Sequence, residues 1–100
     1  MLENLIKVIR QRKQSNADKS YTKQLISSGL DQCVDKLQEE FNELKEALLN
    51  DKSNVIHETA DMIYHLLVSL EVANIKFEDV LNELEKRKKQ SGIKEKKNRK

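Results

Sequence analysis

The sequence predicts an all-α protein, an antiparallel bundle of four to five helices. Two observations lead to this fold class. The 100 residues include two glycines and no proline, a composition that argues against a turn-rich β-sandwich or barrel. Along most of the chain, apolar residues recur with the 3.6-residue period of an amphipathic helix and alternate with charged ones. The length is that of one small domain.

A helix of roughly twelve residues is expected at the N-terminus. Its apolar positions have i, i+3, i+4, i+7 spacing: Leu2, Leu5, Ile6 and Ile9. A polar loop follows over residues 14–19. Ser20 is then a favourable N-cap for a short helix that Gly29 ends.

Two long helices are expected next, over residues 31–49 and 55–73. Asp31 is a favourable N-cap for the first of them, and Asn50 ends it. A short turn follows, in which Ser53 is the expected cap of the second helix. Because the turn is short, the two helices should be antiparallel neighbours.

Apolar side chains cover most of the circumference of the helix predicted over residues 55–73. A helix of this kind must be buried on nearly all sides. A chain this small buries only about two-thirds of its unfolded surface and cannot enclose such a helix. We therefore expect a homodimer in which residues 31–49 and 55–73 share one core. A monomer with an exposed apolar patch is the alternative.

Asn74 ends the second long helix, and a last helix with Val80, Leu81 and Leu84 leads into a basic segment. Residues 86–100 hold nine Lys or Arg and one acid, whereas the preceding residues carry a net charge of −6. We therefore divide the chain into a helical domain, residues 1–88, and a basic tail, residues 89–100. No aromatic residue accompanies the basic ones to stack on nucleic-acid bases, so the tail is interpreted as a solvated terminus.

No stretch of about 20 apolar residues is present, so no transmembrane helix is expected. Charges at Glu3, Lys7 and Arg10 interrupt the region where a secretory signal would have its apolar run. Cys33 is the single cysteine, which excludes an internal disulfide and a zinc site of several cysteines. These features favour a cytoplasmic protein.

Acidic residues on the two long helices are the candidates for chemistry. Each helix carries one pair with i, i+3 spacing: Glu40 with Glu43, and Glu58 with Asp61. Glu39 lies one step further round the first helix, and His65 continues the row on the second. Since the second helix has little surface to spare for solvent, its acids should face the interior and the neighbouring helix.

Four carboxylates held together require protonation, basic partners or a metal ion. Two of them about 5 Å apart repel by roughly 3 kcal/mol at an effective dielectric constant near 20. An all-oxygen set selects a hard cation, and Mg²⁺ bound between carboxylates and substrate phosphates is the usual case. The sequence thus predicts an Mg²⁺ site, and ordinary solvated acidic faces are the alternative. His57 and His65 are expected to pack or support rather than to bind the metal.

The acids form a pattern, Glu39-Glu40-x-x-Glu43 followed by Glu58-x-x-Asp61, that resembles the metal motif of the MazG-like all-α nucleoside-triphosphate pyrophosphohydrolases. Other motifs narrow the resemblance to the phosphoribosyl-ATP pyrophosphohydrolases of histidine biosynthesis. The matching positions are Arg12-Lys13, Ser20-Tyr21-Thr22, Leu25, Gly29, Lys36, the run from Ala60-Asp61 to Tyr64-His65, and Val80-Leu81-x-Glu83-Leu84-x-x-Arg87.

Two features depart from the family pattern, although every acid is retained. Gln38 stands where the family usually has glycine before the paired glutamates. Phe41 and Asn42 stand where small residues often follow that pair.

The resemblance implies Mg²⁺-dependent hydrolysis of phosphoribosyl-ATP to phosphoribosyl-AMP and pyrophosphate. It implies metal binding by Glu40, Glu43, Glu58 and Asp61. Glu39 and Glu40 are the catalytic candidates, with Glu39 either binding a second ion or orienting the attacking water. His65 is expected to contact Asp61 on the side away from the metal ion and so to orient its carboxylate.

For the substrate, the resemblance implies phosphate contacts from Arg12, Lys13 and Lys36 and hydroxyl contacts from Ser20 and Thr22. Many bacteria fuse this domain to a cyclohydrolase; the chain has no room for one, so a stand-alone enzyme is expected. The alternatives are a related enzyme acting on ordinary or damaged nucleoside triphosphates, and a non-catalytic bundle that binds nucleic acid through its tail.

Overall fold

The computed structural model describes residues 1–14 and 21–89, and within these ranges it contains helices and no strand. The all-α prediction is confirmed. The elements are α1 (Leu2–Lys13), α2 (Tyr21–Ser27), α3 (Leu30–Asn50), the 3-10 turn η2 (Lys52–Asn54), α4 (Val55–Val72) and α5 (Phe77–Lys88). Among the described residues, none of the helices combines the length and apolar character that a membrane span needs.

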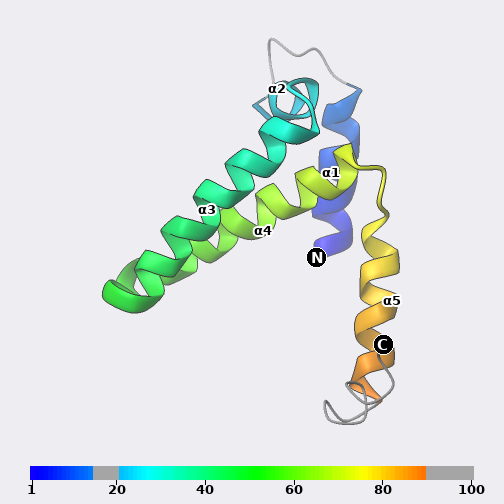
Figure 1. Ribbon diagram of the computed structural model, residues 1–100. Helices are drawn as coiled ribbons and strands as arrows, with labels where there is room; N and C mark the ends of the chain where they lie inside the picture. The colour runs from blue at the N-terminus through cyan, green and yellow to red at the C-terminus, as the bar shows by residue number, and fades with distance from the viewer. Residues whose placement is uncertain (15–20, 90–100) are drawn as a thin grey trace.

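Helices α3 and α4 form an antiparallel hairpin (Figure 1). They pack along each other because the apolar stripe of α3 meets a helix that is apolar on most sides. The turn η2 joins them at one end. At the other end, α1 and α2 pack against the hairpin, and α5 leaves it after a short bend (Figure 1).

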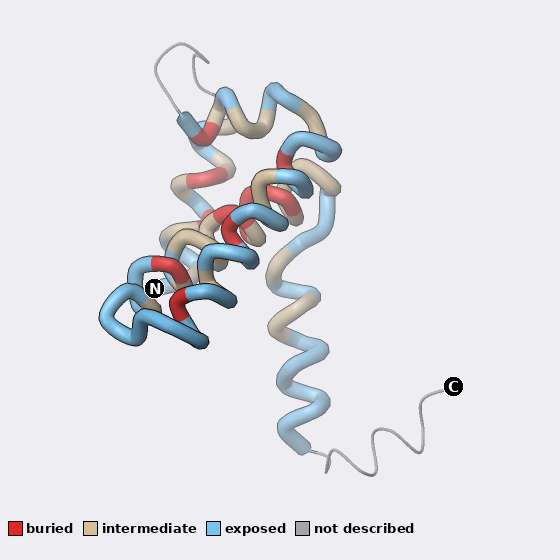
Figure 2. Tube along the Cα trace, turned by 60° about the vertical axis from the view of Figure 1, so that its left-hand side comes forward, coloured by how far each residue is buried: buried red, intermediate tan, exposed pale blue. Residues whose placement is uncertain are grey.

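The buried core lies where α1, α3 and α4 meet (Figure 2). Its members are Ile6, Ile9, Cys33, Leu67 and Val68. Half-buried apolar residues of α2 and the first residue of α5 pack around it. The core therefore lies away from η2, so the η2 end of the hairpin is held by contacts between α3 and α4.

The predicted helices are present, but two predicted caps are wrong. Asp31 does not precede its helix, because α3 begins one residue earlier, directly after Gly29. Gly29 has φ 96°, a conformation that a residue with a side chain rarely adopts. The turn at Gly29 lets α3 begin at Leu30. Ser53 lies inside η2, and Asn54 precedes α4 instead. Ser20 lies outside the described residues, as does the chain from residue 90 onward.

Apolar side chains of α3 and α4 remain exposed on the hairpin of the single chain. The large ones are Val34, Phe41, Leu48, Leu49, Ile56 and Ile63. Ile56 is 86% exposed, so α4 is not buried on nearly all sides by its own chain. The Cα radius of gyration of 15.9 Å exceeds the roughly 13 Å expected of a compact domain of this length.

Candidate metal centre

Three carboxylates converge on the hairpin of α3 and α4. Oxygens of Glu40 and Glu43 from α3 and of Glu58 from α4 lie within 4.8 Å of one another. The i, i+3 spacing puts the first two on one face of α3, and the antiparallel packing brings Glu58 against that face. Glu40 is 6% exposed and Glu58 7%, whereas Glu43 faces solvent.

Each of the two buried carboxylates has one oxygen with a polar neighbour and one without. Asn54 Nδ2 donates a hydrogen bond to Glu58 Oε1 at 3.2 Å. Glu40 Oε1 lies 3.6 Å from Lys36 Nζ and 3.7 Å from His65 Nε2. The Oε2 atoms of Glu40 and Glu58 are buried without a hydrogen-bond partner among the described residues. Such orphaned oxygens are costly, and a hard cation between them would satisfy both.

Asp61 belongs to a second group that shares Glu58. Its possible ligand atoms lie within 4.8 Å of those of Glu58 and His57. His57 Nε2 is 3.2 Å from Asp61 Oδ2, one helical turn away. The structure thus brings three of the four predicted ligands together and places Asp61 beside them rather than among them. His57 was predicted to pack or support and not to be a ligand, although its i, i+4 spacing to Asp61 was visible in the sequence.

His65 has a different neighbour from the one predicted. Its Nε2 faces Glu40 at 3.7 Å, because α3 packs against this side of α4, while Asp61 pairs with His57. His65 is buried, and Tyr21 and Tyr64 approach it edge-on, with ring centroids at 6.2 and 5.7 Å. Burial lowers the pKa of His65 below its usual value, although Glu40 opposes this shift. The imidazole is therefore neutral at pH 7.

Lys36 is the predicted phosphate-binding residue that lies beside the carboxylates. Its Nζ is 3.8 Å from Glu39 and 3.6 Å from Glu40. Partial burial works to lower the pKa of Lys36, but the attraction of Glu39, Tyr21 and Glu40 together outweighs it and raises the pKa. Glu39 points outward, with 66% of its side chain exposed. The ammonium group of Lys36 thus stays charged between an exposed acid and a buried one.

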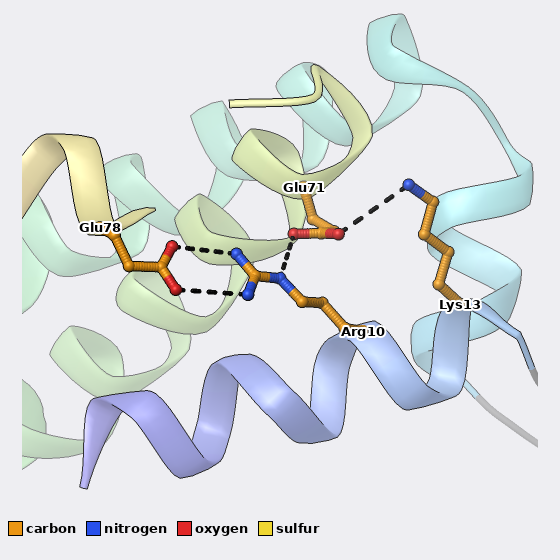
Figure 3. A network of polar contacts seen from close by, with 4 residues as sticks. All are labelled: Arg10, Lys13, Glu71 and Glu78. Atoms are coloured by element: carbon orange, nitrogen blue, oxygen red, sulfur yellow. Dashed lines mark hydrogen bonds and ion pairs between the residues drawn. The ribbon is translucent and has the colours of Figure 1, made fainter. Parts of the chain in front are cut away.

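The other predicted substrate cations lie on α1. Lys13 Nζ is 3.9 Å from Glu71 of α4, and Arg10 Nε is 3.2 Å from the other oxygen of that carboxylate (Figure 3). Arg10 also forms a bidentate pair with Glu78 of α5, at 3.1 and 3.3 Å. Lys13 is therefore part of a network that joins α1, α4 and α5, and Arg12 is exposed beside it.

The predicted hydroxyl contacts have different outcomes. Thr22 is fully buried, and its hydroxyl shares a hydrogen bond with the hydroxyl of Tyr64. It holds α2 against α4 and does not face solvent. Ser20 lies outside the described residues.

The sequence did not predict an open cavity of about 300 Å³ between α2 and α3, to which mainly exposed polar residues contribute. It is lined by Tyr21, Gln24, Leu25, Ser28, Gln32, Asp35, Lys36 and Glu39. The spacing of its polar residues along two helix faces was visible in the sequence. Nothing in the sequence, however, showed that α2 and α3 turn these faces toward each other.

The chain is similar in sequence to known enzymes over nearly its full length. The model of the family described as phosphoribosyl-ATP pyrophosphohydrolase matches residues 2–88. A phosphoribosyl-ATP pyrophosphatase of Allorhizobium ampelinum is 41% identical over 99 residues, which cover 98% of this chain and 95% of that protein. That of Paracoccus denitrificans is 40% identical over 100 residues, covering 99% and 93%. The histidine biosynthesis bifunctional protein HisIE of Helicobacter hepaticus is 43% identical over 101 residues, covering 100% of this chain and 44% of that protein.

Proposed function

The chain belongs to the phosphoribosyl-ATP pyrophosphohydrolase family, and we propose from this membership that it hydrolyses phosphoribosyl-ATP to phosphoribosyl-AMP and pyrophosphate. It is a hydrolase of histidine biosynthesis, and the reaction adds one water across the anhydride between the α- and β-phosphates. Besides the family match, the observation that carries this proposal is the pair of orphaned buried oxygens on Glu40 and Glu58.

Glu40, Glu43 and Glu58 would hold Mg²⁺, with Asp61 completing the set from the adjacent group. When bound there, the ion supplies positive charge that offsets the negative charge of the substrate phosphates. The donor set fits, since it consists of carboxylate oxygens and includes two without another partner. The neutral imidazole of His65 faces Oε1 of Glu40 and orients this carboxylate.

Lys36 and Glu39 act on the substrate side of this centre. The ammonium group of Lys36 binds a phosphate oxygen and stays charged because of its neighbouring acids. The carboxylate of Glu39 is exposed, so it can accept a hydrogen bond from the attacking water or bind a second ion. Lys13 and Arg12 lie in the last turn of α1, where Lys13 is paired with Glu71, and their proposed phosphate contacts are secondary to that of Lys36.

The test is to supply the purified protein with Mg²⁺ and either phosphoribosyl-ATP or the common nucleoside triphosphates, and to measure pyrophosphate. We expect phosphoribosyl-ATP to be the better substrate and Glu58→Gln to lower kcat at least a hundredfold. Glu85→Gln removes one exposed carboxylate from α5 and serves as the matched control, with unchanged rates. Faster turnover of a common triphosphate would favour the alternative of an enzyme that removes ordinary or damaged nucleotides.

A second copy of the chain covers the exposed apolar face of the hairpin in the working enzyme. A hollow of about 240 Å³ lies on this face and is lined by Phe41, Leu44, Lys45, Leu48 and Leu49. A contiguous exposed apolar surface of this kind on a protein marks an interaction site. Ile56 of α4 is 86% exposed and lies outside the buried core of the single chain, which supports the same assignment.

The cytoplasm is the proposed location, because the relatives carry the names of biosynthetic enzymes and the free thiol of Cys33 is compatible with a reducing compartment. The catalytic unit is residues 1–88, which the family model covers almost completely. Removal of residues 90–100 should therefore leave pyrophosphate release unchanged, whereas a nucleic-acid-binding bundle would lose its function with the tail.

A further inference from the structure

The cavity between α2 and α3 has the size and chemistry of a site for part of a nucleotide. Its volume of about 300 Å³ lies at the lower end of the roughly 300–1,000 Å³ of small-molecule sites. Its lining includes two side-chain amides, two carboxylates, a hydroxyl and a tyrosine ring: Gln24, Gln32, Asp35, Glu39, Ser28 and Tyr21. Each of these groups can contact a nucleoside through hydrogen bonds or stacking.

The charges around the cavity select the uncharged part of a nucleotide. Asp35 repels phosphate, as does Glu39 when it holds no ion, and Lys36 is the single cation among the described lining residues. Carboxylates instead accept hydrogen bonds from the vicinal hydroxyls of a ribose, and side-chain amides match the donor and acceptor edge of adenine. The ring of Tyr21 offers a flat surface on which a base can stack.

The cavity adjoins the metal centre at Lys36, which lines it. Its Nζ contacts Glu39, which lines the cavity, and Glu40, which belongs to the converging carboxylates. Tyr21 provides a second connection, because its ring lies edge-on to His65, and His65 faces Glu40. A ligand whose phosphates lie at the carboxylates would therefore extend its next group into the cavity.

We propose that this cavity binds the ribose and adenine that are joined to the α-phosphate, with Lys36 at the boundary between nucleoside and phosphates. This inference rests on the proposed function for the identity of the ligand. The 5-phosphoribosyl group at the far side of the adenine carries its own phosphate, and the carboxylates of the lining keep it outside.

The first test compares two glutamines of α3. Gln32→Leu removes an amide from the cavity at nearly constant volume, and Gln38→Leu removes one outside it, where Gln38 bonds Asn42. We expect Gln32→Leu to raise KM for phosphoribosyl-ATP about fivefold with little change in kcat. The reason is that the variant loses one neutral hydrogen bond to the substrate, and it loses it equally in the ground state and the transition state. Gln38→Leu should change neither constant. Equal KM values for Gln32→Leu and the unaltered enzyme would overturn the inference.

The second test does not depend on turnover. Adenosine is added to the ¹⁵N-labelled protein without Mg²⁺, and the side-chain amide resonances of Gln24, Gln32 and Gln38 are followed. We expect shifts for Gln24 and Gln32 and none for Gln38, and we expect ribose 5-phosphate to produce none. If the protein cleaves phosphoribosyl-ATP but adenosine shifts neither Gln24 nor Gln32, this inference is overturned and the proposed function is not. Adenosine shifts in a protein that does not cleave phosphoribosyl-ATP support the cavity and overturn the proposed function alone.

Discussion

The carboxylates of Glu40 and Glu58 show how burial turns a pair of ordinary acids into candidate metal ligands. Each has one oxygen facing a polar neighbour of its own chain and one oxygen buried without such a neighbour among the described residues. Glu39 and Glu43 carry the same group but face solvent. The chemical difference between these four acids thus comes from their position on α3 and α4 and from nothing in the side chain itself.

The buried carboxylates should make stability depend on Mg²⁺. At a concentration about ten times the dissociation constant, Mg²⁺ stabilises the folded protein by about 1.4 kcal/mol and raises Tm by several degrees. Glu58→Gln keeps an acceptor for Asn54 but removes the charge, so it should relieve repulsion and raise Tm without Mg²⁺. It should also abolish the Mg²⁺-dependent rise. Thermal denaturation with and without Mg²⁺ measures both effects, with Glu85→Gln as control. An undiminished Mg²⁺ response in Glu58→Gln would place the ion elsewhere.

Cys33 is a core residue and not a reactive thiol. It is 2% exposed, its Sγ donates a hydrogen bond to the Leu25 carbonyl at 3.2 Å, and burial raises the pKa of the thiol. We expect a disulfide reagent such as DTNB to modify Cys33 at least tenfold more slowly in the native protein than in urea, since the thiolate is the reactive form. Equal rates in the two conditions would show that the core between α2 and α4 opens freely.

At the scale of elements, α5 differs from the other helices because none of its residues, 77–88, is buried. Its attachment depends on Phe77, which packs against the core, and on the bidentate contact between Arg10 and Glu78 (Figure 3). The same guanidinium also contacts Glu71 of α4. One arginine of α1 therefore joins three helices, and α5 should detach more readily than α3 or α4 separate from each other.

The Arg10–Glu78 contact should make the docking of α5 sensitive to acid. The hydrogen bonds from Arg10 and from the helix backbone lower the pKa of Glu78; Lys76 also lowers it. Glu78 also lies near Glu3: repulsion from Glu78 opposes the overall lowering of the pKa of Glu3. The pKa of Glu78 in the folded protein lies below the usual value of about 4.3 for an unfolded chain. Such a carboxyl contributes its full stabilisation above about pH 4.3 and loses it as pH falls from there through the folded pKa.

Glu78→Gln should therefore lower the free energy of unfolding at pH 6 and have a smaller effect at pH 3. The effect is modest, because the pair is largely exposed. Amide exchange in α5 at pH 6 should accelerate in the variant, and urea denaturation at both pH values gives the difference. Glu85→Gln on the same helix is the control. An effect of Glu78→Gln that is equal at both pH values would exclude this ion pair as its source.

At the scale of the whole molecule, the described chain is more extended than its length requires. The core gathers α1, part of α2 and the adjacent ends of α3 and α4, and the η2 end of the hairpin projects from it (Figures 1 and 2). The exposed apolar residues of α3 and α4 lie on this hairpin. A second copy would bury the apolar hairpin surface that one chain leaves exposed.

A homodimer should be seen by light scattering after size exclusion at micromolar concentration. Leu48→Ser combined with Ile56→Ser removes two large exposed apolar side chains and should yield a folded monomer, because neither belongs to the core of one chain. Leu84→Ser on α5 is the matched control and should remain dimeric. A monomeric mass for the unaltered protein, or a dimeric mass for the double variant, would contradict this assignment.

The order and extent of the helices followed from the sequence alone. The 3.6-residue period in α1, α3 and α4 is a local property, and it survives in the structure with boundaries that differ by one or two residues. The carboxylate spacing on each helix is local in the same sense. The partners across helices are not: the contact of His65 with Glu40, and the separation of Asp61 from Glu43, depend on the rotation of α4 against α3.

Tertiary structure decided three further features. It buried Thr22 against Tyr64, it turned Gln24 and Gln32 toward one cavity, and it engaged Lys13 with Glu71. The physical reason is common to all three. A helix pattern fixes which residues share a face, but the interhelical angle and register that make two faces meet arise from the packing of apolar side chains from several segments at once.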